Sequence, residues 1–474
     1  MQQNIPTCEQ TPDISNFKVD AGDVSQVAKV KQFLEIWSGD EVFRELLKTD
    51  PEKALQLYEL KDIDADAMKI LWDYDTAVKY PPGSKDIPDA VVKYRKFVQN
   101  KLAHRDYLQK NGCSPSDANF NAWRKRQLNR CWFELGTRNA SIVHAPLVIE
   151  LTKGCSVGCW FCGISSQKFE GAFAYSAENA ELWRQSLNIF REIIGPAAGS
   201  GVCYWATEPL DNPDYEKFCV DFHEILGSFP QTTTAIALKN VERTKNLIKL
   251  AMEKNSFINR FSILNLASFR NVYKQFTPEE LLYVEIINQN SESMVLKSNS
   301  GRARQSKNKE INDTASTIAC ISGFLINMVE KSVKLISPCI SSDEWPKGYY
   351  IFDSGTFTDA QSLEELLRAI ISRSMWPTVR HFNLMRLVNG LNYEDSDDGG
   401  FRVFNQNFSI KYNSALPWIG QIKEYIKRGD TTAGDIAMQI YEKHGAPPEE
   451  VFITMNYIFK CGVIDEDPNL NKNK

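Results

Sequence analysis

The spacing of apolar residues changes along this chain of 474 residues and divides it into regions. Residues 1–20 are polar and are predicted to form a disordered tail. Over residues 21–145 the apolar positions recur every three or four residues, as in VAKVKQFLEIW, which predicts a region of amphipathic helices. The first of these are short, and longer ones are expected over residues 87–110 and 116–128.

From residue 146 onward, short apolar runs alternate with helical patterns. The first run, Leu147 to Leu151, is typical of a buried strand. Further strands are predicted over residues 201–206, 232–238, 259–264 and 294–297, with helices over residues 178–194, 214–226, 241–253 and 278–287. This order predicts an α/β fold, a partial (β/α)6-type barrel of about five or six parallel strands over residues 146–313, with ligands at the carboxyl ends of the strands.

Two further regions are expected after the barrel. Residues 314–400 contain two β-rich segments joined at Glu330-Lys331, which predict a hairpin beyond the last barrel strand and then a bridging region. Residues 401–474 contain strands followed by three helical segments, the order of a small winged-helix-like module. Because this module carries equal numbers of basic and acidic residues, a DNA-binding winged helix is disfavoured.

The amino-acid composition mainly excludes certain classes of partner and location. The chain is 43% apolar and 24% charged, and its net charge of −5 and pI near 5.8 argue against nucleic-acid or membrane-surface partners. No apolar run approaches the ~20 residues that span a bilayer, and the amino terminus lacks a secretion signal, so a cytoplasmic location is expected. In that compartment the 11 cysteines, an odd number, do not suggest a disulfide framework.

The strongest chemical signal is a run of cysteines directly after the first predicted strand. Cys155, Cys159 and Cys162 are spaced C-x3-C-x2-C on one short loop, which suits three irons of a cubane cluster and leaves a fourth iron open. Phe161 stands where its ring can lie against a flat cofactor. The alternatives are three buried apolar cysteines or a zinc knuckle that lacks one ligand.

A strand followed by C-x3-C-x-(aromatic)-C and a helix resembles the radical S-adenosylmethionine (radical SAM) superfamily. The resemblance implies a [4Fe–4S] cluster, SAM bound at the open iron, and an external electron donor such as flavodoxin or ferredoxin. Where that family usually carries Gly-Gly-Glu-Pro, this chain has Ala-Thr-Glu-Pro, so Glu208 is the expected acceptor for the methionine ammonium. Thr234, Arg260 and Ser262, on later strands, are expected near the ribose or the carboxylate of SAM.

Longer stretches resemble the radical SAM peptide epimerases of ribosomally made natural products, the proteusin type. These stretches are FLEIWSGDEVFRELL, ELTKGCSVGCWFCG, YWATEPLDNPDY and CISGFLINMVEKSVKLISPC, and the carboxy-terminal module looks like a leader-peptide recognition domain. The resemblance implies conversion of L- to D-residues in a precursor peptide. The hairpin also resembles that of accessory-cluster domains, although no cysteine lies between Cys339 and Cys461 to complete a second cluster.

Return of a hydrogen atom to a peptide Cα radical calls for a thiol, because an S–H bond is weak enough to give up its hydrogen. Cys339, just after a strand and stiffened by Pro338, is the preferred donor, and Cys320 is the second candidate. Two alternatives stay open. The same residues could serve peptide crosslinking or excision, or the chain could be a non-catalytic scaffold that binds leader peptides.

Overall fold

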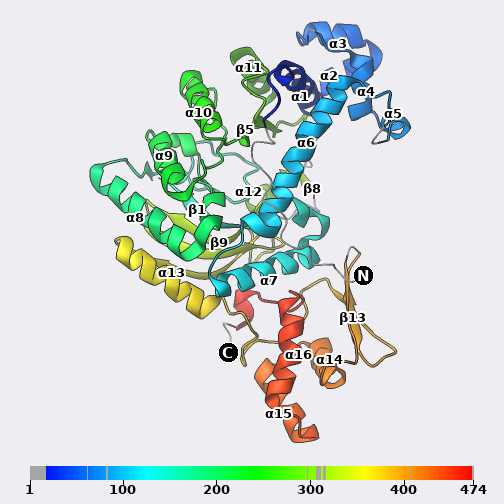
Figure 1. The fold of residues 1–474 in the computed structure, drawn as a ribbon, viewed down its shortest axis with the longest axis vertical. Helices are drawn as coiled ribbons and strands as arrows, with labels where there is room; N and C mark the ends of the chain where they lie inside the picture. The colour runs from blue at the N-terminus through cyan, green and yellow to red at the C-terminus, as the bar shows by residue number, and fades with distance from the viewer. Residues whose placement is uncertain are drawn as a thin grey trace.

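The computed structural model describes residues 18–60, 62–81, 84–295, 297–305, 311–312, 317–406 and 408–471. Most of the predicted tail over residues 1–20 lies outside the described residues, and so does part of the polar loop that precedes residue 317. The described fold is mixed α/β, with a helical amino-terminal region, a central sheet region and a carboxy-terminal module (Figure 1).

The amino-terminal region consists of helices, as the apolar spacing predicts. They are α1 (Val24–Gly39), α2 (Glu41–Thr49), α3 (Pro51–Leu57), α4 (Ala65–Trp72), α5 (Tyr74–Lys79), α6 (Asp89–Tyr107) and α7 (Ala118–Leu135). Aspartates define several of the starts, since the Asp40, Asp50 and Asp64 side chains accept hydrogen bonds from free backbone N–H groups of the first turns of α2, α3 and α4. The longest of these helices, α6, runs from this region toward α7 (Figure 1).

One central sheet has the order β1-β9-β10-β11. Its strands are β1 (Ala145–Glu150), β9 (Ile321–Asn327), β10 (Ser332–Pro338) and β11 (Tyr349–Thr356). The β9–β10 hairpin forms as predicted, but its place was predicted wrongly. Instead of extending beyond the last barrel strand, β9 pairs in parallel with β1, with Val148 opposite Leu325. The reason is that β9 and β1 are both apolar on both faces, so each is buried best against the other.

A second sheet is parallel, with the order β4-β5-β6. Its strands are β4 (Thr233–Thr234), β5 (Asn259–Ile263) and β6 (Val284–Asn288), and a parallel bridge from Val148 to Val202 marks the position of the strand predicted over residues 201–206. The predicted helix over residues 278–287 is wrong, because a turn leads directly into β6 there. The strand predicted over residues 294–297 is reduced to β7 (Lys297–Ser298), paired with β8 (Ile311–Asn312).

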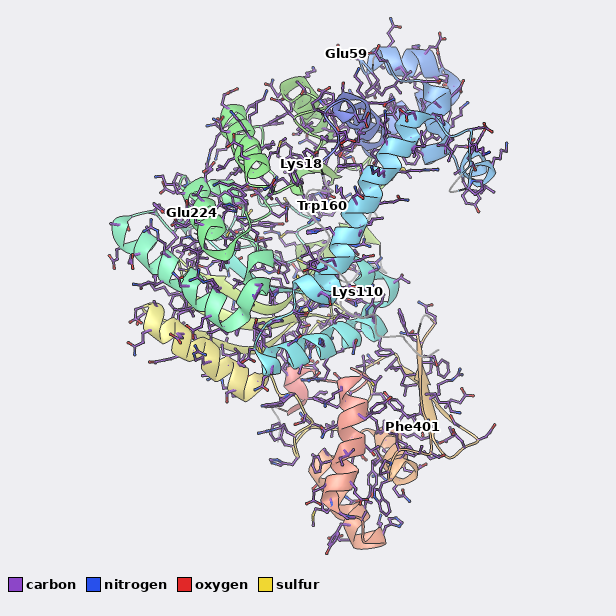
Figure 2. The ribbon with its side chains drawn as sticks, viewed as in Figure 1. Lys18, Glu59, Lys110, Trp160, Glu224 and Phe401 are labelled. Carbon is purple, nitrogen blue, oxygen red and sulfur yellow. The ribbon has the colours of Figure 1, made fainter. Side chains whose placement is uncertain are left out.

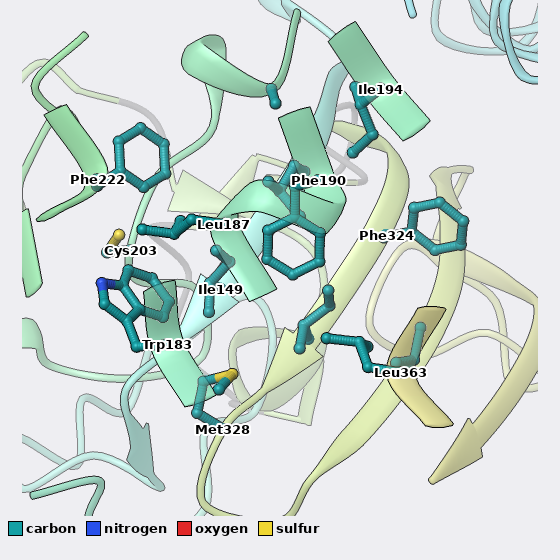
Figure 3. Close-up of a cluster of buried hydrophobic side chains, with 14 of the residues drawn as sticks. Ile149, Trp183, Leu187, Phe190, Ile194, Cys203, Phe222, Phe324, Met328 and Leu363 are labelled. Atoms are coloured by element: carbon teal, nitrogen blue, oxygen red, sulfur yellow. The ribbon is translucent and has the colours of Figure 1, made fainter. Parts of the chain in front are cut away.

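Helices pack against one face of these sheets. The covering helices are α8 (Ala177–Ile194), α9 (Tyr215–Leu226), α10 (Val241–Glu253), α11 (Leu266–Gln275) and α13 (Ala360–Ser374). Ile149 on β1 and Phe324 on β9 pack against Trp183 and Phe190 of α8 in the largest core (Figure 3). The opposite face of β1, β9 and β10, here called the inner face, carries a smaller cluster of buried residues: Val148, Ile164, Ala319, Ile321, Leu325, Ile336 and Tyr349.

The carboxy-terminal module is a three-stranded antiparallel sheet followed by three helices. Its elements are β12 (Asn392–Asp395), β13 (Phe401–Phe404), β14 (Ser409–Tyr412), α14 (Ile419–Arg428), α15 (Ala433–His444) and α16 (Pro448–Lys460). It docks on α7 through Arg126, whose Nε lies 2.7 Å from a carboxylate oxygen of Glu466 and whose guanidinium stacks on Phe459. Figure 1 places this module at the end of the molecule away from α2–α4.

Candidate functional site

The three motif cysteines lie on the irregular segment between β2 (Thr152–Lys153) and β3 (Gly171–Ala172). Gly154 opens this loop with a φ of +76°, and a Cβ there would lie 2.1 Å from the carbonyl oxygen of Lys168. Only glycine fits such a left-handed, crowded position. The amide of Cys155 donates to the carbonyl of Gln167 at 2.9 Å, which closes the loop on itself. The local sequence therefore forces the chain to fold back around the three thiols.

The three thiols are all half-buried, and neighbouring thiols affect the pKa of Cys159 electrostatically. Burial and the neighbouring Cys162 and Cys155 together raise the pKa of Cys159 to about 11, because burial disfavours a thiolate and a thiolate at one position disfavours another nearby. Burial also opposes ionisation of Cys162, but hydrogen bonds from Ser166 and Ile164 and the charge of Arg302 together outweigh it, so the pKa of this thiol is lowered. Ser166 contributes its amide at 3.3 Å and its hydroxyl at 3.2 Å.

Arg302, on the short helix α12 (Gly301–Gln305), donates hydrogen bonds to the backbone of the cysteine loop. Its Nε donates to the carbonyl of Cys159 at 3.0 Å, and its Nη1 donates to the carbonyl of Ser166 at 2.8 Å. The backbone of Gly301 approaches so closely that a Cβ there would lie 2.5 Å from the carbonyl oxygen of Cys162. The guanidinium also lowers the pKa values of Cys159 and Cys162, which favours the thiolates that bind metal.

These residues fit an iron–sulfur cluster better than a single metal ion. Among the described residues, no three His, Cys, Asp or Glu side chains converge closely enough to hold one ion. A cubane cluster separates its thiolate ligands more widely, because each binds a different iron. The half-buried Cys155, Cys159 and Cys162 on a glycine-shaped loop beside a cation have the donor chemistry that such a cluster requires.

The aromatic pair within the motif has one exposed and one sheltered ring. Phe161 is half-buried and packs edge-on against Trp160, with ring centroids 5.4 Å apart. Trp160, labelled in Figure 2, keeps 40% of its surface exposed, and the Lys297 ammonium lies over its ring. Phe161 therefore has a neighbour that fixes its orientation, and its suitability for stacking on a cofactor stays a prediction.

Glu208 and Thr234 meet at the carboxyl end of β4. Thr234 Oγ1 donates to Glu208 Oε1 at 2.7 Å, and the amide of Ala235 donates to Oε2 at 2.8 Å. Glu208 is only 3% exposed, and this burial raises its pKa to about 7 despite the hydrogen bonds that oppose the shift. A cavity of about 80 Å³ beside Thr234 and Ser262 is far smaller than the pockets that hold small-molecule ligands.

The side chains of Arg260 and Ser262 lie on one face of β5, and the side chain of Thr234, on β4, lies on the other face of the sheet. Along β5 the residues alternate between buried and half-buried, and Thr234 pairs with Phe261 on the buried face. Arg260 instead pairs across the sheet with Glu285, at 2.8 Å from Nε to Oε2. The structure thus brings Glu208 and Thr234 into contact and pairs Arg260 with Glu285 instead, while Ser262 lines the same small cavity as Thr234.

The two candidate thiol donors occupy different surroundings. Cys320 contacts the inner-face cluster, which Cys162 also contacts, and it touches a small cluster around Cys131 on α7. Burial raises the pKa of Cys320 to about 11 despite the opposing charge of Arg260. Cys339 is 0% exposed and lies outside that cluster. Burial raises the pKa of its thiol, and Glu134 raises it further.

Sequence reasoning missed one buried acid beside the motif. Glu150, the last residue of β1, is 7% exposed, and it accepts hydrogen bonds from the amide of Ala206 at 2.8 Å and from Asn327 Nδ2 at 3.0 Å. Burial raises its pKa, whereas these hydrogen bonds and Lys334 lower it. A carboxylate that ends an otherwise apolar buried strand is the signal that could have found it.

Comparison with known proteins identifies one relative that shows the family of this chain. The chain matches no protein-family model. It is 34% identical over 457 residues to the uncharacterized protein y4wI of Sinorhizobium fredii, covering 93% of this chain and 88% of that protein. The chain therefore belongs to the same family as that protein.

Among solved structures, the crystal structure of BtrN in complex with AdoMet and 2-DOIA aligns with 48% of this chain and 82% of that chain. The two are 16% identical with a TM-score of 0.32, a likeness too slight to carry an argument about this protein. Separately, none of the helices in the described ranges combines the length and apolar character needed to cross a bilayer.

Proposed function

We propose that this protein is a radical SAM enzyme that converts L- to D-residues in a ribosomal precursor peptide. The observation that carries the first half of the proposal is the C-x3-C-x2-C loop, with its half-buried thiols, left-handed Gly154 and bracing Arg302. When bound, the [4Fe–4S] cluster and SAM would supply a 5′-deoxyadenosyl radical that takes the hydrogen atom from a peptide Cα. Cys155, Cys159 and Cys162 would hold the cluster, and Glu208 would accept a hydrogen bond from SAM.

The first test is iron content. Anaerobic reconstitution of the wild type should give one oxygen-sensitive [4Fe–4S] cluster, and a variant with Cys155, Cys159 and Cys162 all changed to Ala should give none. A variant with Cys113 changed to Ala is a matched control, because this thiol is fully buried and lies outside the motif loop. Iron and a cluster spectrum at the wild-type level in the triple variant would contradict the proposal.

Epimerisation also needs a protonated thiol that returns a hydrogen atom to the opposite face of the Cα radical. A Cα–H bond forms, the S–H bond breaks, and the thiyl radical takes one electron and one proton from the external donor and water. Cys320 and Cys339 both keep their protons at neutral pH because burial raises their pKa values. Cys320 and Cys162 both pack against the buried side chains of the inner face. This shared contact supports Cys320 as donor more than Cys339, which the sequence favoured.

Deuterium labelling tests the donor. In deuterated water the wild type should place one deuterium at each epimerised Cα, because a thiol exchanges with solvent. Cys320→Ala should keep its iron and its SAM cleavage and lose D-residue formation, while Cys339→Ala should keep all three. Full epimerisation by Cys320→Ala would exclude that thiol. Loss of iron in Cys339→Ala would instead support an auxiliary cluster. A change of peptide mass with wild-type enzyme would favour crosslinking or excision, since epimerisation leaves mass unaltered.

We further propose that the carboxy-terminal module binds the leader of the precursor by strand addition at the free edge of β14. The amide of Asn405 donates to the carbonyl of Phe408 at 2.9 Å, and antiparallel ladders alternate, so Lys411 turns its N–H away from β13. Lys411→Pro should therefore block strand addition and keep the β13–β14 ladder intact.

The control for that test is Lys411→Ala, which keeps the N–H and removes the ion pair of Lys411 with Asp398. Fluorescence anisotropy of a labelled leader should show at least about tenfold weaker binding for the proline variant than for the alanine variant. Equal affinities of the two variants would rule out this edge. Absence of 5′-deoxyadenosine from reconstituted enzyme that binds leader normally would favour the scaffold alternative.

A further inference from the structure

Three charged side chains form a chain of ion pairs from the amino-terminal helices to the sheet. Lys101 on α6 places its Nζ 2.6 Å from Oε1 of Glu285, and Arg260 places its Nε 2.8 Å from Oε2 of the same carboxylate. Each carboxylate oxygen thus has its own cation. Figure 1 shows α6 connecting the amino-terminal helices with α7, so Lys101 brings a charge from outside the sheet region to β6.

The Nη nitrogens of Arg260 are available to bind a ligand. Within the described ranges, its Nη nitrogens donate to no protein group, and the side chain remains 42% exposed beside the pair. Burial lowers its pKa, but the neighbouring Tyr204, Glu285 and Cys320 raise it, and the net shift is upward. Arg260 pairs in register with Thr233 of β4, and Thr233 Oγ1 donates to the hydroxyl of Tyr204 at 2.7 Å. Trp205, the next residue, packs against the same buried residues of the inner face as Cys320 does. Arg260 therefore lies on the side of the proposed hydrogen donor, whereas Glu208 accepts its hydrogen bonds from Thr234 and Ala235.

We propose that Arg260 binds a carboxylate of the precursor peptide beside the residue being epimerised, and that Lys101 and Glu285 are positioning residues that hold Arg260 for this task. The inference rests on the proposed function, because it assigns part of the substrate to the thiol side of the site. It makes the amino-terminal helical region a contributor to substrate recognition.

Charge and geometry both require Lys101 in this arrangement. Two cations and one carboxylate leave a net positive charge of one, which attracts an anion, and removal of Lys101 would leave none. Lys101 also occupies Oε1 of Glu285. Without it, that oxygen would be open to an Nη of Arg260, because carboxylates accept the arginine fork in a bidentate manner. The edge that faces the ligand would then be taken by Glu285.

The test compares binding of two ligands to reconstituted full-length enzyme: SAM, and a synthetic peptide that carries a helical leader and an acidic residue in its core. Lys101→Met should weaken peptide binding about tenfold, which corresponds to about 1.4 kcal/mol, and should leave SAM binding unchanged. Lys101→Arg should restore the affinity, since it keeps the charge. Lys93→Met is the matched control, because Lys93 also lies on α6 and pairs with Asp23 at 2.8 Å far along the helix.

Peptide variants identify the carboxylate. Replacing the contacted Asp or Glu of the core peptide by its amide should cost as much as Lys101→Met, and the two losses should not add in a double-mutant cycle. If Lys101→Met lowers the melting temperature far more than Lys93→Met does, peptide binding by Arg260→Met replaces it as the test. Arg260→Met leaves the pair of Lys101 with Glu285 in place.

Each result separates the alternatives. Peptide affinity equal to that of wild type in both Lys101→Met and Arg260→Met would overturn the inference. Weaker SAM binding with unchanged peptide binding would also overturn it, by assigning the arginine to the carboxylate of SAM. Wild-type enzyme that binds peptide in this charge-dependent way but never forms 5′-deoxyadenosine would refute the proposed function and leave the recognition site standing.

Discussion

If Glu208 binds SAM as proposed, its buried carboxyl should make SAM binding depend on pH in a way that can be measured. Its pKa is about 7 in the folded protein, against an ordinary value of 4.5, because burial disfavours the charge. Between these values the folded protein holds a proton that the unfolded chain has released. Stability without ligand should therefore fall as pH rises from 4.5 to 7, by at most about 3 kcal/mol at 1.36 kcal/mol per pKa unit.

A hydrogen bond from the amino group of SAM favours the carboxylate and lowers this pKa in the complex. Binding should then release a proton below pH 7, so that affinity for SAM improves by about tenfold between pH 6 and pH 8 through Glu208 alone. The α-amino group of SAM titrates near this range as well. The quantity to compare is therefore the pH dependence of wild type minus that of Glu208→Gln.

Equilibrium dialysis under anaerobic conditions, with reconstituted protein, measures both dissociation constants at each pH. Thr234→Val provides a second test, because it removes the hydroxyl that donates to Glu208 Oε1 at 2.7 Å and should raise the pKa of Glu208. The inflection of the binding curve should move upward in that variant. An identical pH dependence in wild type and Glu208→Gln would refute the reasoning.

Two further predictions concern the cysteine loop. Gly154→Ala should abolish iron binding, because its Cβ would lie 2.1 Å from the carbonyl of Lys168. Gly158 is also left-handed but has no atom within 4 Å of such a Cβ, so Gly158→Ala should cost only about 1–2 kcal/mol of backbone strain and keep its iron. Equal iron contents in the two variants would contradict this prediction. Arg302→Met should speed iron loss to a chelator about tenfold, since it frees two loop carbonyls. Arg304→Met, which removes a pair with the exposed carboxylate of Asp343, should not, and equal rates would argue against the bracing role.

The sequence alone determined the features that depend on neighbours within a few residues. The C-x3-C-x2-C spacing and Gly154 define the loop wherever it is placed, because left-handed backbone and thiol spacing are local properties. Helices such as α8 and α10 were predicted within about one residue, since their apolar stripes repeat with the period of the helix. The carboxy-terminal order of strands followed by three helices was equally readable.

Tertiary structure decided the features that depend on pairing between distant segments. Residues 284–288 form β6 rather than part of a helix, because β5 supplies a parallel partner for their backbone groups. The hairpin joins β1, a choice between exposed edges that periodicity does not encode. The pairing of Arg260 with Glu285 and Lys101 likewise brings β5, β6 and α6 together. Charges that far apart in sequence meet only when the chain has packed, so spacing alone could name Arg260 and could not name its partners.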